Sequence, residues 1–147
     1  MTIRAAKLED LPQLAQLFEA YRIFYRKKPN LAAAKQFLSK RIQEKDSEIY
    51  VAASDEGDLA GFVQLYPLFS STRMKRVWLL NDLFVQSTFR GKGVSIQLIE
   101  RAKQLVKDTN AHGMYLETEK SNVIGNRLYP RTGFTLNELA NYYEWEA

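Results

Sequence analysis

The sequence predicts a mixed α/β fold in which helices cover a central sheet. Two observations carry this prediction: short apolar segments with strand character recur along the chain, and between them lie segments whose apolar residues repeat at helical spacing. With 147 residues, 46% of them apolar and 26% charged, the chain can bury a core of its own. No repeat or linker interrupts it, so residues 1–147 are expected to form a single domain.

One strand and two helices are expected in the first third of the chain. Thr2–Ala5 has strand character, and Asp10 is a plausible N-cap for a helix with Pro12 in its first turn. That helix carries an apolar stripe formed by Leu11, Leu14, Leu17, Phe18 and Tyr21. Pro29-Asn30 breaks the pattern, and a second helix is predicted over Leu31–Glu44.

Three strands are expected next. Glu48–Ala53 and Leu59–Tyr66 flank Asp55-Glu56-Gly57-Asp58, whose Asp and Gly content is typical of a hairpin turn. We predict a loop over Pro67–Lys75. Arg76–Val85 is a long, mostly apolar run of the kind found near the centre of a sheet.

The last third is expected to add two helices and two or three strands. We predict a helix over Val94–Lys107, a strand over Met114–Glu119 and a short helix over Asn122–Tyr129. Phe134–Trp145 is expected to form one or two further strands, which gives a mixed sheet of six to seven strands with four helices. A right-handed crossover should join Arg76–Val85 to the strand after the third helix.

A turn rich in glycine and basic residues lies between the central strand and the third helix. Glycine lets the backbone approach a ligand, and the start of a helix offers unpaired N–H groups and the positive end of its dipole to an anion. Glycine in such a turn can also serve packing alone. A diphosphate is the expected ligand of the turn, which consists of Arg90, Gly91, Lys92, Gly93, Val94 and Ser95. Nearby basic residues expected to support a ligand with several phosphates are Arg73, Lys75 and Arg76.

The composition excludes several functions. The chain has no cysteine, so disulfides, zinc thiolate sites and a cysteine nucleophile are excluded, and no metal is expected. No apolar run approaches the ~18 residues of a membrane span, so we expect a cytoplasmic protein without membrane association. The net charge is +4, and basic residues dominate between Arg22 and Lys45. Nucleic-acid binding is not expected, because the chain lacks a recognisable nucleic-acid module.

A second motif follows the strand predicted over Met114–Glu119. It reads Asn122-Val123-Ile124-Gly125-Asn126-Arg127-Leu128-Tyr129, followed by Gly133-Phe134. Together with the glycine turn and the order of elements, this motif resembles the signatures of the GNAT superfamily of acyl-CoA N-acyltransferases. Through Phe62-Val63-Gln64-Leu65-Tyr66 and Leu80-Asn81-Asp82-Leu83-Phe84-Val85, the chain resembles most the small spermidine/spermine-type and histone-type acetyltransferases. The resemblance implies a GNAT fold with splayed central strands.

The resemblance also implies that acetyl-CoA is the co-substrate. In the family the strand before the glycine turn leaves its neighbour, and its backbone pairs with the pantetheine arm; the matching residues are Leu83, Phe84 and Val85. Arg90 and Gly93 match the family's phosphate loop, whereas Ser95 stands where the family has Gly or Ala. The residues that match those beside the arm are Asn122, Gly125 and Asn126, and Asn122 is equally expected to cap its helix.

Tyr129 occupies the position at which the family carries the tyrosine that protonates the departing thiolate. A phenol suits this role, because its pKa of about 10 keeps it protonated at neutral pH. The alternative is a core aromatic residue opposite Phe134. Pro130 is expected to end or bend the helix at Tyr129.

Many relatives deprotonate the acceptor amine with a glutamate on the central strand, and Asn81 holds the matching position here. An amide is not basic, so the resemblance leaves the role to Asp82, Glu117, Glu119 or bulk water. Strand alternation places Asp82 on the face opposite Asn81, unless a bulge intervenes.

The expected function is therefore direct transfer of an acetyl group from acetyl-CoA to a primary amine within a ternary complex. The acceptor is expected to be a small molecule, although an amino acid, a polyamine or a protein lysine presents the same nucleophile. A non-catalytic acyl-CoA-binding regulatory domain is the alternative, because Asn81 and Ser95 depart from the family pattern. A homodimer is also a possibility, with Tyr142-Tyr143-Glu144-Trp145 as an interface.

Overall fold

The computed structural model describes residues 1–147, which divide into two compact units, Met1–Leu116 and Glu117–Ala147. The first unit holds the sheet and three helices, and the second holds the fourth helix, α4 (Val123–Arg131). That the whole chain acts as a single domain remains a prediction. None of the helices combines the length and apolar character needed to cross a bilayer.

The sheet of the first unit has five strands whose spatial order follows the sequence. Its pairings are antiparallel except the last, which is parallel. The strands are β1 (Thr2–Ala5), β2 (Glu48–Ala53), β3 (Leu59–Ser70), β4 (Lys75–Val85) and β5 (Met114–Tyr115). Helix α3 (Val94–Asp108) connects β4 to β5, as a parallel pair requires.

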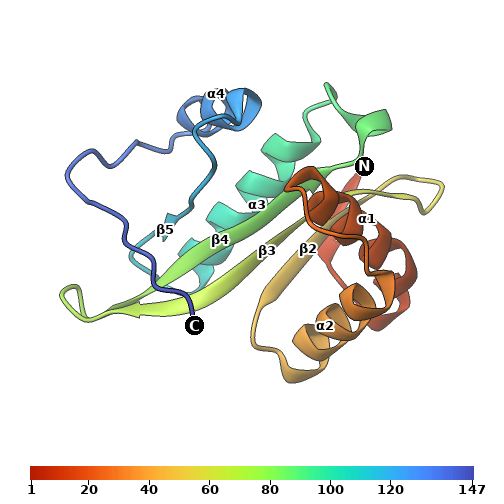
Figure 1. Ribbon diagram of the computed structural model, residues 1–147, viewed down its shortest axis with the longest axis horizontal. Helices are drawn as coiled ribbons and strands as arrows, with labels where there is room; N and C mark the ends of the chain where they lie inside the picture. Colours follow the sequence, from red (N-terminus) through yellow and green to blue (C-terminus); the bar gives the residue numbers. More distant parts are fainter. The chain divides into compact units, whose positions relative to one another are not determined.

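Helices cover both faces of this sheet (Figure 1). Helices α1 (Leu11–Phe24) and α2 (Leu31–Glu44) pack on one face, where Leu14 and Leu38 join Phe62 in the main apolar core. On the other face, the guanidinium of Arg101 in α3 lies 4.1 Å from the ring centroid of Tyr50. The apolar stripe predicted for the first helix therefore faces this core.

Asp10 stands at the N-cap position of α1, but its side chain does not cap the helix. A short 3₁₀ turn, Leu8–Asp10, leads straight into α1, so the backbone of Asp10 is already helical. Its carboxylate instead accepts hydrogen bonds from the Arg4 guanidinium at 2.7 and 2.8 Å and from the Lys7 N–H at 2.8 Å. The residue ties β1 to the start of α1.

The loop predicted over Pro67–Lys75 is wrong, because β3 and β4 continue as a long hairpin to Ser70 and Lys75. Pairing of β3 with β2 ends at Leu65, so Pro67 lies where β3 has only one neighbour. A proline, which lacks an N–H, is tolerated there.

The prediction of six to seven strands is also wrong. β5 ends at Tyr115 rather than at Glu119, whose carbonyl accepts a hydrogen bond from Asn126 Nδ2 at 2.9 Å instead of joining the sheet. Phe134–Trp145 forms no strand. Its large apolar side chains, such as Leu139 and Trp145, are exposed and so build no sheet face. The prediction of four α-helices is confirmed.

Candidate functional site

Most of β4 lacks a partner on the β5 side. The two strands pair only at Trp78 with Met114 and at Leu79 with Tyr115. From Leu80 to Val85, no residue of β4 pairs with β5, and every residue except Asn81 pairs with β3. An edge of main-chain groups on β4 is therefore open between the last two strands of the sheet.

The hydrogen-bond pattern identifies which residues face this open edge. Gln86 N–H donates to the Ala60 carbonyl at 2.8 Å, so the pair Ala60 and Gln86 is a hydrogen-bonded one. In an antiparallel ladder such pairs alternate with pairs whose main-chain groups point outward. The backbone of Leu83 and Val85 consequently faces the open edge, while the side chain of Phe84 packs toward the core under α1 and α2.

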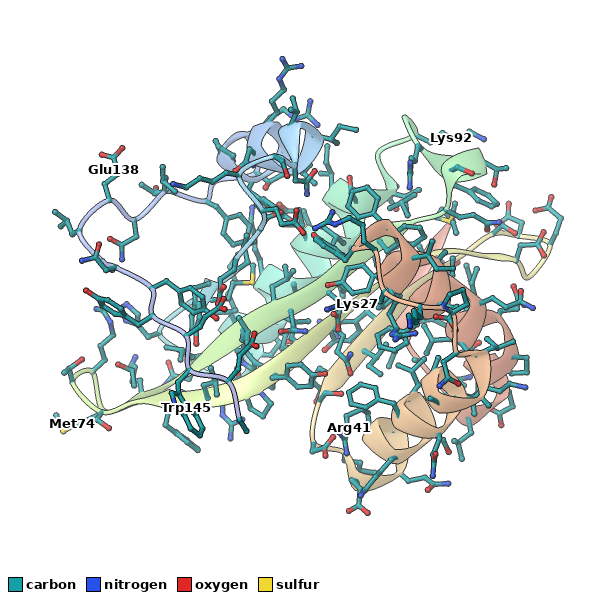
Figure 2. All side chains as sticks on the ribbon, viewed as in Figure 1. Lys27, Arg41, Met74, Lys92, Glu138 and Trp145 are labelled. Atoms are coloured by element: carbon teal, nitrogen blue, oxygen red, sulfur yellow. The ribbon has the colours of Figure 1, made fainter.

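The glycine turn follows directly. Gly91 and Gly93 adopt φ of 76° and 77°, the left-handed region that only glycine enters freely, and a Cβ on either would meet no atom within 4 Å. Arg90 Nε donates to the Val85 carbonyl at 3.0 Å and so fixes the turn to the end of β4. Lys92 lies at this end of the strand (Figure 2), with its ammonium 5.5 Å from the Phe89 ring centroid.

The start of α3 offers free donors to this turn. Gly93 is the N-cap residue and provides no side-chain cap. The N–H groups from Gly91 to Ile96 take no part in the chain's hydrogen bonds, and Gly93 accepts the first helical bond from Gln97. Val94 is buried and anchors the helix, whereas Ser95 is half-buried beside it. The turn can therefore donate several N–H groups to one anion.

Arg73, Lys75 and Arg76 do not flank the glycine turn, which contradicts that prediction. They lie at the hairpin tip marked by Met74, at the opposite end of β4 from Lys92 (Figure 2). A strand of this length spans roughly 30 Å. Arg76 instead stacks between Phe69 and Trp78, at 5.1 and 5.4 Å from their ring centroids.

A β-bulge interrupts β4 at Asn81. Gln64 pairs with Asp82 and Leu65 with Leu80, so Asn81 has no partner on β3. The bulge brings two consecutive side chains together: Asn81 Nδ2 donates to Asp82 Oδ1 at 3.0 Å. A bulge was the one condition under which Asn81 and Asp82 were not expected to lie on opposite faces of the strand, and the structure has this bulge.

Asp82 is a buried carboxylate in a polar network. The residue is buried, with 3% of its surface exposed. Gln64 Nε2 donates to its Oδ2 at 2.7 Å, and Ser47 Oγ donates to Gln64 Oε1 at 2.9 Å. Burial raises the pKa of Asp82, against the opposing hydrogen bonds from Gln64, Tyr21 and Asn81. A carboxylate with a raised pKa is a better proton acceptor at neutral pH.

Tyr21 connects α1 to this network. Its Oη donates to the Asn81 carbonyl at 3.2 Å, and the same hydroxyl lowers the pKa of Asp82 as a hydrogen-bond donor, so its single proton serves one of these two acceptors at a time. Its ring packs at 6.0 Å from Phe62 and 6.4 Å from Phe84, centroid to centroid. The hydroxyl is therefore held at the bulge by an aromatic cluster.

In the second unit, Asn122 caps α4 as predicted. Its Oδ1 accepts from Gly125 N–H at 3.1 Å, and its Nδ2 donates to Thr118 Oγ1 at 2.9 Å. A Cβ at Gly125 would lie 2.5 Å from Asn122 Nδ2, so the cap requires glycine there. Asn126 Nδ2 donates to the carbonyls of Asn122 and Glu119. These three residues shape the start of α4.

Tyr129 lies in the last turn of α4, and its ring meets Phe134 at 5.7 Å and 77°. Phe134 N–H donates to the Tyr129 carbonyl at 3.0 Å, and Gly133 adopts φ of 95°, which together form a Schellman motif. The helix includes Pro130 and ends at Arg131, so the prediction that it ends at Tyr129 is wrong. The contact between the Tyr129 and Phe134 rings is therefore present, as expected if Tyr129 serves as an aromatic packing residue.

Comparison with known proteins decides the family. The model of the acetyltransferase (GNAT) family matches residues 11–134, which include the open edge, the glycine turn and α4. The chain belongs to the GNAT family.

Similar proteins agree with this assignment. The chain is 41% identical over 134 residues to the uncharacterized N-acetyltransferase YhfO of Bacillus subtilis, covering 91% of this chain and 89% of that protein. A crystal structure of a probable acetyltransferase, 40% identical, superposes with a TM-score of 0.94 over 100% of this chain and 98% of the other. The spermine/spermidine N(1)-acetyltransferase of Bacillus subtilis is 33% identical over 87 residues, 56% of each chain.

The residues of the first unit fit the acyl-CoA that GNAT proteins use as co-substrate. Gly91 and Gly93 leave open space where side chains would stand, and the N–H groups beyond them are free for phosphate oxygens. The outward backbone groups of Leu83 and the outward N–H of Val85 match the role implied for the pantetheine arm, whereas the Val85 carbonyl already accepts from Arg90.

Sequence reasoning missed two residues of this GNAT site, Gln64 and Tyr21. Gln64 is fully buried within the apolar run of β3, and a polar residue in such a run signals a buried partner. Tyr21 was predicted to join the apolar stripe of α1, and its ring does so. Nothing in the sequence indicates the partner of its hydroxyl, because that partner lies sixty positions further along the chain.

Proposed function

We propose that this GNAT protein transfers the acetyl group of acetyl-CoA directly to a primary amine within a ternary complex. The observation that carries the proposal is the continuity of the open β4 edge with the glycine turn: Arg90 ties the turn to Val85, the last residue of that edge. A ligand with an extended amide arm and a diphosphate can use both features at once.

Asp82 is proposed as the general base. The acceptor ammonium loses a proton to this carboxylate, and the nitrogen lone pair then attacks the thioester carbonyl. An outward N–H of β4 stabilises the resulting oxyanion, an effect worth about 3 kcal/mol in other enzymes. Asn81 contributes to the site by holding Asp82 rather than by accepting a proton.

Tyr129 is proposed as the general acid. When the carbon–sulfur bond breaks, the thiolate of coenzyme A takes the phenol proton. The nitrogen of the new amide, still protonated after the attack, returns a proton to the tyrosinate, and the neutral acetamide leaves. The phenol is suited to this step because it is protonated at neutral pH. Asn122, Gly125 and Asn126 are proposed to contact the pantetheine arm in addition to shaping α4.

The acceptor class proposed is a small amine. The name of one relative specifies spermine and spermidine as its acceptors, which supports testing polyamines first. Amino acids and a lysine-containing peptide complete the panel.

The test measures thiol release from acetyl-CoA with each acceptor, alongside acetyl-CoA binding by calorimetry. Turnover with at least one amine, accompanied by one acetylamide product per thiol, supports the proposal. Binding without turnover on any acceptor supports the non-catalytic regulatory function instead, and failure to bind acetyl-CoA contradicts both.

A further inference from the structure

The base proposed above is almost fully covered. Asp82 is 3% exposed, and its two oxygens accept amide hydrogen bonds from Gln64 and Asn81. An acceptor amine approaching the sheet therefore meets other side chains before it meets this carboxylate. A group that touches both Asp82 and the exterior is needed to pass the proton on.

Tyr21 has the position and the chemistry for this task. It is half-buried, and its hydroxyl lies 3.2 Å from the carbonyl of Asn81, the residue next to Asp82, where it acts on the pKa of Asp82 as a hydrogen-bond donor. A hydroxyl can donate its single proton while it accepts another. Its ring is fixed by Phe62 and Phe84, so the hydroxyl stays in place during the exchange.

We propose that Tyr21 relays a proton from the acceptor amine to Asp82. The inference rests on the proposed acetyltransferase function. In the step, the acceptor ammonium gives a proton to Tyr21 Oη as the Tyr21 O–H proton passes to Asp82. The electrons of the broken N–H bond become the lone pair that attacks the thioester. Tyr21 ends neutral, Asp82 ends as the neutral acid, and the positive and negative charges cancel.

Other titratable groups face Asp82 less directly. Tyr66 on β3 senses only the charge of the Asp82 carboxylate, whereas Tyr21 acts on Asp82 as a hydrogen-bond donor. Burial, followed by the charge of Asp82, raises the pKa of Tyr66 to about 12. Arg41 of α2 lies near Tyr66, but its Nε pairs with Asp46 at 2.8 Å. Tyr21 is therefore the relay that the contacts select.

The experiment compares Tyr21→Phe with Tyr25→Phe. The first removes only the hydroxyl and keeps the ring in its cluster. The second is a matched control, because the Tyr25 ring contacts Tyr21 at 5.1 Å but its hydroxyl takes no part in the network around Asp82. We expect kcat/KM to fall about 100-fold in Tyr21→Phe and to change less than twofold in Tyr25→Phe, with unchanged acetyl-CoA binding in both.

Two further readouts separate a relay from a structural role. In mixtures of light and heavy water, the wild-type rate should curve with deuterium fraction, since two protons move together, and a straight line contradicts the relay. The Asp82→Asn, Tyr21→Phe double variant should be no slower than Asp82→Asn alone. A Tyr21→Phe variant as fast as the wild type overturns the relay and leaves the proposed function intact, whereas a wild type without turnover on any acceptor overturns the function itself.

Discussion

Asn81 and Asp82 are consecutive residues of β4, yet their side chains share a 3.0 Å hydrogen bond. In a regular strand they would point to opposite faces. Because of the bulge, the Asn81 amide, at the position where many relatives carry a glutamate, holds the carboxylate of the next residue, Asp82. This contact supports the proposal of Asp82, rather than Asn81, as the base.

Asp82→Asn should remove the base while keeping the shape of the site. We expect kcat/KM to fall by about 10²–10⁴, with acetyl-CoA binding unchanged, because the arm and phosphates use other residues. Steady-state kinetics and calorimetry check this. Asp46→Asn is the control, since Asp46 pairs with Arg41 outside the network. An Asp82→Asn variant with wild-type kcat/KM would exclude Asp82 as the base.

Ionisation of Asp82 should also shape the pH dependence of stability. Its pKa is raised in the folded state, mainly by burial, so the folded protein binds that proton more tightly than the unfolded chain does. The protonated Asp82 therefore stabilises the fold fully at pH below its pKa in the unfolded chain. This stabilisation is lost as the pH rises through its higher pKa in the folded protein. Relative to Asp82→Asn, the wild type should therefore lose stability as pH rises from about 4. Urea unfolding of both proteins across this range tests the sign, and a gain would contradict it.

Gly93→Ala should weaken acetyl-CoA binding beyond its effect on stability. The left-handed backbone costs about 1–2 kcal/mol with any Cβ, and the new methyl enters the open space of the turn. Gly57→Ala is matched, because Gly57 has φ of 91° and an added Cβ there also meets no atom within 4 Å, but this glycine lies in the β2–β3 turn. We expect similar losses in Tm and at least a tenfold weaker Kd in Gly93→Ala alone. Equal Kd values would remove the turn from the binding site.

Gly125→Ala should disrupt the cap of α4. The added methyl would lie 2.5 Å from Asn122 Nδ2 and 3.3 Å from Tyr129 Cε2, so the cap must move. Loss of such a cap costs about 1 kcal/mol. Gly113→Ala, which meets nothing within 4 Å, should leave Tm nearly unchanged. Thermal unfolding compares the two variants, and equal Tm values would show that the cap tolerates a side chain.

Tyr129→Phe separates the two roles of that residue. The ring contact with Phe134 and the Schellman hydrogen bond do not involve the hydroxyl, so both should remain in the variant, and α4 should keep its C-terminal turn. Loss of the proton donor should lower kcat by about 10²–10⁴. Tyr143→Phe, at an exposed position, is the control. Unchanged kcat in Tyr129→Phe would leave only the structural role.

The sequence predicted the helices well because their signals are local. The bounds of α2 and the position of the glycine turn follow from breakers and periodicity within a few residues. The hairpin beyond Pro67 was missed for a different reason: whether a proline is tolerated depends on how many neighbours its strand has, and β2 ends earlier.

The candidate site shows the same division. Gly93 and Asn122 act through their own local backbone and were predicted correctly as turn and cap. The network around Asp82 depends on the register of β3 against β4, which no short segment encodes. The strands predicted at the end of the chain are absent for another reason. The aromatic residues there have high β propensity, but their side chains are exposed and pack on no sheet, so propensity alone does not form a strand.

The open stretch of β4 also bears on solubility. Unpaired main-chain groups in a flat strand are a template on which extended segments of other chains can add and aggregate. Tyr21 and Arg90 already engage the carbonyls of Asn81 and Val85, from opposite ends of the stretch. A foreign strand finds these two acceptors taken, so the same side chains that frame the site also protect the sheet from unwanted β-sheet extension.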